Sequence, residues 1–283
     1  MEIIELIKAV LIGIVQGITE WLPVSSTGHM ILFDEFVKLD VSAEFMDFFL
    51  VSIQLGSILA VLVLFFSKLN PFSRKKTKDE QRATYSLWLH IIVGCMPAAV
   101  IGVLFEDQID ALFDQSGRAY AVVAIALLVY GVAFIVIEHL RDMKKAPDRI
   151  AEAEKIGYRD ALLIGCFQVL ALIPGTSRSG STVLGACLLG VSRPAAAEFS
   201  FFMAMPVMAG ASLLKGVKFL SAGGAMTTNE IGVLIVGTVT AFVVSLVAIR
   251  FLMDFVRRHS FAAFGWYRIA LGAAVLLYFG VSS

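Results

Sequence analysis

Six apolar segments, each about as long as a membrane-spanning helix, constrain this chain more than any other feature of its sequence. A helix that crosses the hydrocarbon core of a bilayer needs about 20 predominantly apolar residues. Hydrophobic residues make up 58% of the 283-residue chain and charged residues 16%, whereas a soluble domain carries about 25% charged residues. The sequence therefore predicts an all-α, polytopic membrane protein. The predicted spans are residues 46–66, 87–105, 119–138, 196–219, 231–249 and 263–281.

Two further apolar regions, residues 3–33 and 159–191, are interrupted near their middle. Pro23 interrupts the first region and Pro174 the second, and a proline ends a helix because it lacks an amide donor and clashes with the preceding turn. The halves, at about 10–15 residues each, are too short to cross a bilayer alone. We therefore expect two re-entrant helical hairpins in addition to the six spans.

The returning helix of each hairpin begins at small hydroxyl residues that can cap it. Ser25 or Ser26 is the predicted N-cap in the first hairpin, and Ser177 in the second. The N-terminus of a helix exposes free N–H groups and the positive end of the helix dipole, so it binds anions. We expect the two N-termini to meet near mid-membrane and to form the two halves of one anion site.

The two hairpins resemble each other in sequence, as do the spans that follow them. Gln16 recurs as Gln168, and Ser26 aligns with Ser177 one residue out of that register. Each copy holds one hairpin and three spans, and because three is odd, the second copy must be inverted relative to the first. We therefore predict one integral membrane domain over residues 1–283, made of two inverted-topology repeats at about residues 1–140 and 159–283.

The charged loops predict how the chain is oriented. Lys and Arg are concentrated in residues 67–86, 139–160 and 250–260, whereas residues 106–118 are mainly acidic. By the positive-inside rule, the three basic loops are cytoplasmic. The first hairpin then enters the membrane from outside and the second from the cytoplasmic face, so their tips can meet.

Four residues at the hairpin tips are the candidate catalytic residues: Glu20, Ser26, His29 and Arg178. Ser26 and His29 are three residues apart and share a helical face. A hydroxyl beside an imidazole and a carboxylate is the arrangement of an activated nucleophile. Alternatively, His29 shuttles a proton or is itself the nucleophile, with Ser26 a donor to phosphate. Arg178 supplies a planar cation that matches phosphate oxygens, so the set suits phosphoryl transfer.

Small polar residues around these four are expected to bind phosphate. Their hydroxyls can donate hydrogen bonds, and backbone N–H groups near glycine can approach a ligand closely. Gln16 and Glu20 are four residues apart on one helical face and could together hold a divalent metal ion. The predicted phosphate-binding residues are Ser25, Thr27, Gly28, Thr176, Ser177, Ser179, Gly180 and Thr182.

Structural explanations for the same residues remain open at this point. Glu20 and Arg178 could form an ion pair that only ties the hairpins together, and the serines could be only caps and interhelical contacts. His29 could be a packed, hydrogen-bonded side chain. Ionisable residues inside a membrane are nevertheless functional candidates by default. Arg250 and Arg268 are expected to snorkel or pair near the cytoplasmic face. The three tryptophans, Trp21, Trp88 and Trp266, are expected to lie at the membrane interface, and Trp21 is also a candidate to line the site.

The two polar stretches resemble the signatures of the undecaprenyl pyrophosphate phosphatases, the bacitracin-resistance family of bacterial membranes. The first signature stands here as QGITEWLPVSSTGH at residues 16–29, and the second as PGTSRSGST at residues 174–182. The similarity extends over essentially the whole chain, and two long motifs in the same order are specific to this family.

This resemblance implies removal of the terminal phosphate from undecaprenyl pyrophosphate, a C55 isoprenyl lipid, which regenerates the monophosphate carrier for peptidoglycan and cell-wall polymer synthesis. It also implies a multi-pass protein of the bacterial plasma membrane, with an active site open to the outer side and activity that depends on Mg2+ or Ca2+. Glu20, His29 and Arg178 then take the essential roles, and Ser26 is the leading candidate nucleophile. Some members carry Glu where this chain has Gln16, so a second metal-binding carboxylate is missing here.

Two other classes of membrane protein are compatible with parts of the sequence. Inverted repeats are typical of transporters, so a transporter or flippase of a lipid-linked phosphate is the alternative function. The acid-phosphatase-like lipid phosphatases share short motifs, but the chain lacks their KxxxxxxRP segment. The expected partners are undecaprenyl pyrophosphate and the lipid bilayer, and a homodimer is left open. With 23 basic and 23 acidic residues, the chain gives no reason to expect a nucleic-acid partner.

Overall fold

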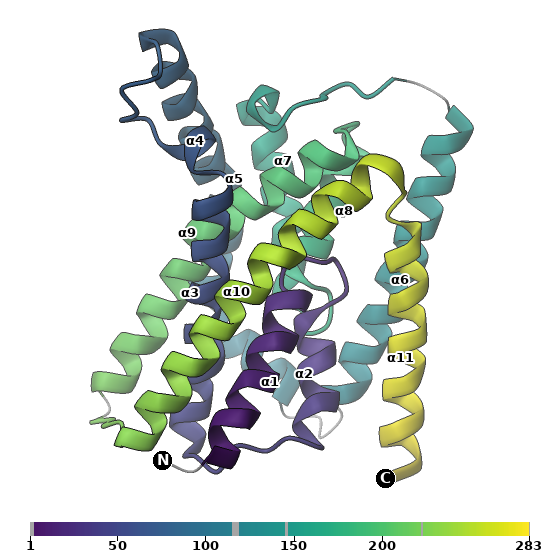
Figure 1. Ribbon diagram of the computed structural model, residues 1–283. Helices are drawn as coiled ribbons and strands as arrows, with labels where there is room; N and C mark the ends of the chain where they lie inside the picture. The colour runs from purple at the N-terminus through teal and green to yellow at the C-terminus, as the bar shows by residue number, and fades with distance from the viewer. Residues whose placement is uncertain (1–2, 115–118, 145–146, 222, 283) are drawn as a thin grey trace.

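The computed structural model describes residues 3–114, 119–144, 147–221 and 223–282 (Figure 1). These residues form helices and connecting segments, with one isolated β-bridge between Ile150 and Val191. The helices are α1 (Ile3–Thr19), α2 (Ser26–Asp34), α3 (Ala43–Leu64), α4 (Phe66–Leu69), α5 (Lys78–Asp114), α6 (Ala119–Lys144), α7 (Tyr158–Val169), α8 (Arg178–Leu188), α9 (Arg193–Ser221), α10 (Thr228–Arg258) and α11 (Ala262–Ser282), with two 3-10 turns, η1 (Ala153–Lys155) and η2 (Leu170–Leu172).

Six of these helices are long and apolar enough to cross a membrane: α3, α5, α6, α9, α10 and α11. Each predicted span falls on one of them, so the prediction of six apolar helices is confirmed, and the helices fit a multi-pass membrane protein. Several extend beyond the apolar segment that predicted them. The first turn of α5, for example, contains Asp79 and Glu80, whose negative charges are favourable at the positive end of the helix dipole.

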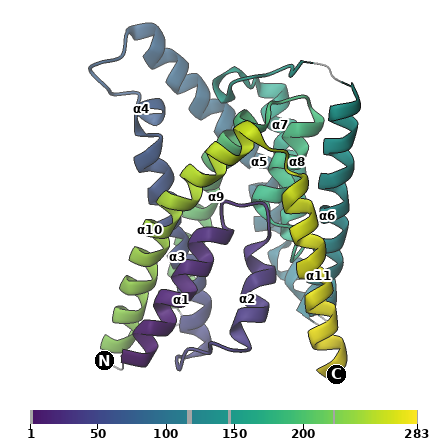
Figure 2. The same cartoon turned by 45° about the vertical axis from the view of Figure 1, so that its right-hand side comes forward.

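Two shorter helix pairs, α1–α2 and α7–α8, pack among the long helices. α8 is almost entirely buried, whereas α1 exposes one apolar face that includes Ile3, Ile4 and Ile7. In Figure 1, α1 and α2 rise from the lower end, and α7 and α8 descend from the upper end. Figure 2 shows α2 lying between α1 and α11. α1 packs mainly against α10, and α7 against α5. The two pairs therefore enter from opposite ends, and their connecting turns meet in the middle.

The second helix of each pair begins at a serine with the same unusual backbone. Ser25 caps α2 and Ser177 caps α8, with φ angles of 73° and 70°. Each side-chain oxygen accepts a hydrogen bond from a glycine N–H three residues later, at 3.2 Å in both turns. This geometry pairs Ser177 with Ser25, so the predicted alignment of Ser26 with Ser177 was wrong by one residue. Ser25, and not Ser26, is the N-cap of α2.

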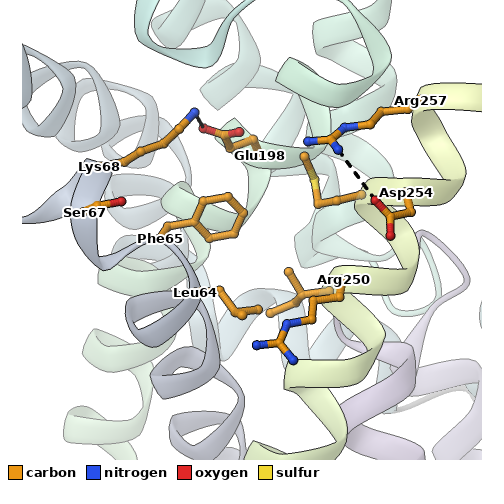
Figure 3. A pocket seen from close by; sticks show the side chains of 10 residues that line it. Leu64, Phe65, Ser67, Lys68, Glu198, Arg250, Asp254 and Arg257 are labelled. Carbon is orange, nitrogen blue, oxygen red and sulfur yellow. Dashed lines mark hydrogen bonds and ion pairs between the residues drawn. The ribbon is translucent and has the colours of Figure 1, made fainter.

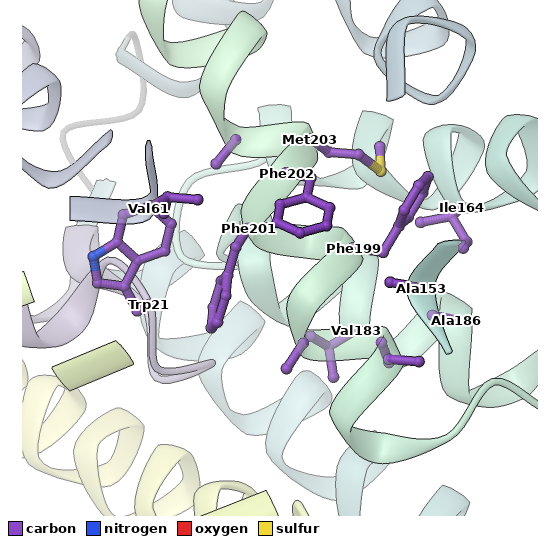
Figure 4. Packing of buried hydrophobic residues seen from close by; sticks show 14 of the residues in the cluster. Trp21, Val61, Ala153, Ile164, Val183, Ala186, Phe199, Phe201, Phe202 and Met203 are labelled. Atoms are coloured by element: carbon purple, nitrogen blue, oxygen red, sulfur yellow. The ribbon is translucent and has the colours of Figure 1, made fainter. Parts of the chain in front are cut away.

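Aromatic side chains of α9 fill the centre of the largest apolar cluster (Figure 4). Phe199, Phe201 and Phe202 are fully buried. Trp21, in the turn after α1, packs edge-on against Phe201 with ring centroids 5.2 Å apart. The prediction of Trp21 as an interface anchor is therefore wrong, because its indole is buried in this cluster. Trp266, in contrast, is exposed.

The turn between α7 and α8 requires glycine at position 175. Gly175 has a φ of +92°, and a Cβ there would lie 2.7 Å from backbone atoms of Val123. We expect Gly175→Ala to lower the free energy of unfolding by about 2 kcal/mol or more, because it adds overpacking to backbone strain. Gly223→Ala is the matched control, since Gly223 has a φ of +79° in open space. Equal losses of thermal stability in detergent for the two variants would contradict the steric explanation.

Candidate active site

Direct hydrogen bonds join the turns of the two helix pairs. Arg178, the first residue of α8, donates from Nη2 to Oε1 of Glu20 at 3.1 Å. The Ser179 hydroxyl donates to the Glu20 carbonyl oxygen at 3.2 Å. Within the first pair, Gln16 Nε2 donates to the other carboxylate oxygen of Glu20 at 3.0 Å. The structure thus brings together Gln16, Glu20 and Arg178, and the ion pair considered from the sequence is present.

Arg178 is held from several sides. Its side chain is 11% exposed, and Nη1 donates to the carbonyl oxygen of Ser200 in α9 at 2.9 Å. Its guanidinium carbon lies 6.0 Å from the centroid of the Trp21 ring. Trp21 therefore borders the site while remaining part of the core. These contacts fix the guanidinium in position, as recognition of a phosphate group requires.

Ser26 and Thr27 begin α2 and keep their hydroxyls available. Ser26 is half-buried and Thr27 is exposed. Among the described residues, neither hydroxyl takes part in a hydrogen bond, whereas the neighbouring Ser25 oxygen accepts one from the N–H of Gly28. A free hydroxyl at a helix N-terminus is the requirement for a nucleophile that attacks an anionic group. The predicted role of Ser26 remains a prediction that this geometry suits.

His29 is oriented by two partners outside the predicted set of catalytic residues. Its Nδ1 lies 2.7 Å from the Ser25 carbonyl oxygen, and its Nε2 lies 2.7 Å from the Tyr267 hydroxyl. Since a carbonyl only accepts, Nδ1 carries the proton, and in the neutral ring Nε2 accepts from Tyr267. The two rings stack with centroids 5.6 Å apart. Both imidazole nitrogens are thus engaged by residues other than Ser26.

Several predicted phosphate-binding hydroxyls use their proton inside the protein. Thr176 donates to the carbonyl oxygens of Leu170 and Ile173, each at 2.8 Å. Thr182 Oγ1 lies 2.9 Å from the Arg178 carbonyl oxygen, and Ser179 donates to Glu20 as described. A hydroxyl has a single proton to donate, so these residues shape the second turn. Ser25 and Ser177 act as acceptors for the N–H groups of the predicted residues Gly28 and Gly180.

Arg268 of α11, which sequence reasoning did not connect with the site, joins both turns. Its side chain is fully buried. It donates to the carbonyl oxygen of Pro23 at 3.2 Å and to those of Gly175 and Thr176 at 2.9 and 3.0 Å. Its guanidinium carbon lies 5.3 Å from the centroid of the Tyr130 ring. The expectation that Arg268 snorkels to the cytoplasmic face is wrong, because the turns offer it carbonyl acceptors inside the bundle.

Buried donors without an acceptor gather around the two turns. Arg178 Nε, Arg268 Nε and Trp21 Nε1 are buried and have no hydrogen-bond partner among the described residues. A buried N–H group left unpaired costs about 1–3 kcal/mol. Gly180 lies close beside them, since a Cβ there would be 3.1 Å from Arg268 Nη1 and would press on that guanidinium. Such donors call for an acceptor that the described residues do not provide, such as an ordered water molecule or a bound ligand.

The donor set for a metal ion is small. Across the described ranges, no three His, Cys, Asp or Glu side chains gather in a way that could hold a metal ion. Glu20 offers a carboxylate, and the Oε1 atom of Gln16 remains an acceptor because Gln16 bonds Glu20 through Nε2. Mg2+ is commonly bound by one or two protein oxygens together with substrate phosphates. The residues present fit a metal ion that arrives with a phosphorylated substrate.

An apolar cavity of about 570 Å³ opens beside the start of α2. Thr27, the residue that follows Ser26 in the sequence, is one of the residues that line it. Its walls are mostly apolar and come from α1, α2, α3, α6 and α11. The lining residues are Ile12, Thr27, Met30, Ile31, Phe33, Glu35, Val37, Met46, Leu50, Tyr120 and Phe279.

Comparison with known proteins gives consistent matches over nearly the whole chain. A family model described as "Bacitracin resistance protein BacA" matches residues 9–274. The chain is 57% identical over 278 residues to "Undecaprenyl-diphosphatase 1" of Clostridioides difficile, covering 98% of this chain and 97% of that protein. It is 54% identical over 271 residues to "Undecaprenyl-diphosphatase" of Enterococcus faecalis, covering 96% of each.

The contacts of Arg268 predict that one substitution loosens both turns. In Arg268→Gln, we expect amide hydrogen exchange to rise about tenfold or more in residues 20–28 and 173–180 together, because three carbonyls lose their donor. Arg268→Lys keeps the charge but loses the planar fork, so intermediate protection is expected. Arg258→Gln, at the exposed end of α10, is the control. Unchanged protection at either turn in Arg268→Gln would show that this arginine does not hold them.

Proposed function

The chain belongs to the bacitracin resistance protein BacA family, and on this premise we propose that it is an undecaprenyl-diphosphatase. It hydrolyses the terminal phosphate of undecaprenyl diphosphate and releases the monophosphate lipid. Within the site, one observation supports this proposal most directly. Buried N–H donors of Arg178 and Arg268 lack acceptors among the described residues, and they lie near the N-terminus of α2, where the Ser26 hydroxyl is unbonded. An anionic phosphate group would supply those acceptors.

The proposed reaction proceeds in two steps. Ser26 Oγ attacks the distal phosphorus while its proton passes to Glu20, and the bond from that phosphorus to the bridging oxygen breaks. The lipid monophosphate leaves as an anion, because the second pKa of a phosphate monoester is about 6. Water then attacks the phosphoserine, Glu20 returns its proton to Ser26 Oγ, and inorganic phosphate leaves with the oxygen and protons of the water.

Charge neutralisation provides most of the catalysis in this scheme. Arg178 is already oriented by Glu20 and Ser200, so its guanidinium needs little rearrangement when the distal phosphate binds. The N-terminus of α2 adds backbone donors and the positive end of its dipole. A divalent cation, Mg2+ or Ca2+, would be held by Glu20 and the Gln16 side-chain oxygen and would neutralise charge on the diphosphate. His29, fixed by Ser25 and Tyr267, supports the start of α2.

The apolar cavity beside Thr27 suits the isoprenyl chain of the substrate. It borders the residue that follows the proposed nucleophile, and its walls include Met30, Phe33 and Leu50. Burial of apolar chain contributes about 25 cal/mol for each Å² removed from water. The first isoprene units would lie here, and the remainder of the chain would extend into the bilayer.

We further propose that the two halves of the chain are inverted repeats with re-entrant hairpins. The matching caps at Ser25 and Ser177, and the approach of the two hairpins from opposite ends, support this arrangement. The basic loops support an active site that opens to the outer side of the bacterial plasma membrane. The names of the relatives favour the phosphatase over the transporter alternative. A homodimer remains a prediction from the sequence.

Phosphate release by the purified protein in detergent tests the proposed function. Wild type is expected to release inorganic phosphate from undecaprenyl diphosphate, and EDTA is expected to abolish the release. Ser26→Ala should lower kcat by about 10³-fold or more, as loss of a nucleophile does. Arg178→Lys should lower kcat/KM strongly, because the ammonium cannot form the bidentate contact. Ser73→Ala, in the loop after α4, is the control. A folded wild type that releases no phosphate would contradict the phosphatase assignment and favour the transporter.

Trapping the intermediate distinguishes the two candidate nucleophiles. Substrate labelled in its distal phosphate should transfer label to the protein, and rapid acid quenching should preserve it, because phosphoserine survives acid and phosphohistidine does not. We expect acid-stable label that is absent from Ser26→Ala and still forms, more slowly, in His29→Ala. Acid-labile label that depends on His29 would instead make the imidazole the nucleophile.

A further inference from the structure

A second cavity, of about 400 Å³, lies between the upper part of α10 and the junction of α3 with α4 (Figure 3). Charged and apolar side chains line it together, unlike the mostly apolar cavity near Thr27. The lining residues are Leu64, Phe65, Ser67, Lys68, Glu198, Ile249, Arg250, Met253, Asp254 and Arg257.

An aromatic layer separates this cavity from the catalytic turns. Phe65 lines the cavity and packs against Phe202 and Phe201, with ring centroids 5.3 and 6.4 Å apart. Phe201 in turn packs against Trp21, whose ring borders Arg178. The cavity is therefore distinct from the site assigned to the diphosphate.

Two arginines of α10 present unused donors to the cavity. Arg250 reaches toward Leu64 in Figure 3, and among the described residues its guanidinium has no hydrogen bond or ion pair. Arg257 lies 3.6 Å from Asp254, which is longer than a hydrogen bond. Planar guanidinium groups are suited to bidentate contact with phosphate oxygens. The two residues are two helical turns apart, about 10 Å along α10, and in Figure 3 Arg250 points toward Leu64 and Arg257 toward Glu198. Arg250 is therefore the group that can make this contact, and Arg257 adds positive charge at the other end of the cavity.

The remaining charges in the cavity are largely neutralised by one another. Lys68 donates to Glu198 at 2.6 Å and pairs with Glu154 at 2.8 Å. Although burial opposes it, hydrogen bonding to these two carboxylates raises the pKa of Lys68. Lys68 therefore stays protonated and neutralises the Glu198 carboxylate. Arg257 pairs with Asp254, so among the described residues that line the cavity Arg250 is the cation without a carboxylate partner.

The surroundings of the cavity are those of a membrane-facing groove. Leu64, Phe65 and Met253 give it an apolar wall. Below it, α3 and α10 expose apolar side chains, among them Val63 at 57% and Val247 at 64%. The neighbouring loop 67–86 is the most basic in the sequence, which places the cavity at the cytoplasmic headgroup level. Basic pockets between helices on that side bind the headgroups of anionic lipids.

We propose that this cavity binds the phosphate group of an anionic phospholipid from the cytoplasmic leaflet. Arg250 contacts the phosphate oxygens, Arg257 adds positive charge to the cavity, and an acyl chain lies along the apolar surfaces of α3 and α10. Asp254 weakens the site by competing for Arg257. The proposal is independent of the phosphatase assignment, because it rests on a different cavity and different residues.

Lipid binding to the purified full chain tests the proposal. Native mass spectrometry in detergent would measure the dissociation constants of phosphatidylglycerol and of zwitterionic phosphatidylcholine. Wild type should prefer phosphatidylglycerol, and Arg250→Gln should weaken that lipid about tenfold while leaving phosphatidylcholine unchanged. Asp254→Asn should tighten phosphatidylglycerol, since it frees Arg257. Arg258→Gln removes a charge from the same helix outside the cavity and should have no effect.

Two further arms make the result decisive. Melting temperatures and phosphate-release rates close to wild type would show that the variants are folded. Inorganic phosphate at millimolar concentration should compete weakly with the lipid, because it lacks the acyl chain. Binding of inorganic phosphate as tight as that of phosphatidylglycerol would assign the cavity to the free anion and overturn the lipid proposal. An unchanged preference for phosphatidylglycerol in Arg250→Gln would overturn it as well.

Discussion

The fully buried guanidinium of Arg268 is the interaction on which the candidate site depends. A charge removed from water is costly unless it is hydrogen-bonded, and here three backbone carbonyls and the face of Tyr130 surround it. Those carbonyls belong to two turns that are about 150 residues apart in sequence. The cost of burying the charge is thus offset only when both turns are in place. Glu20 and Arg178 can meet because the same two turns meet.

Backbone strain at the turns serves the same arrangement. Ser25 and Ser177 both have positive φ angles, which cost a non-glycine residue of order 1–3 kcal/mol each. In return, each serine satisfies an N–H group in the first turn of its helix while the rest of that helix N-terminus stays open. The two N-termini therefore lie in the interior of the bundle, and each capping serine satisfies one N–H group of its first turn. Their donors are available to an anion.

The sequence predicted what depends on local pattern and missed what depends on distant partners. Apolar length identified the six long helices, and Pro23 and Pro174 identified the two interruptions. Glu20 and Arg178 were found because charged residues are rare in such segments. Tyr267 and Arg268 were missed as site residues, because their partners lie on other helices. The residues near Arg268 in sequence do not show that it will bind backbone carbonyls of distant turns. An arginine inside an apolar span is, however, a signal of a functional or structural role. The register of Ser26 failed although the sequence held a signal for the correct one: Ser25 and Ser177 are each followed by a glycine three residues later, in the register that relates Gln16 to Gln168.

The aromatic layer determines how strongly these charges act. On one side, the Arg178 guanidinium faces the buried ring of Trp21, which packs against Phe201, so apolar side chains rather than water border it there and the effective dielectric constant is low. A charge pair is stronger in such surroundings than in water, which favours the Glu20–Arg178 contact when no ligand is bound. The same surroundings strengthen the attraction between Arg178 and a diphosphate, which carries more negative charge than one carboxylate. Glu20 is therefore the partner that orients Arg178 in this structure, and the buried aromatic wall strengthens that contact.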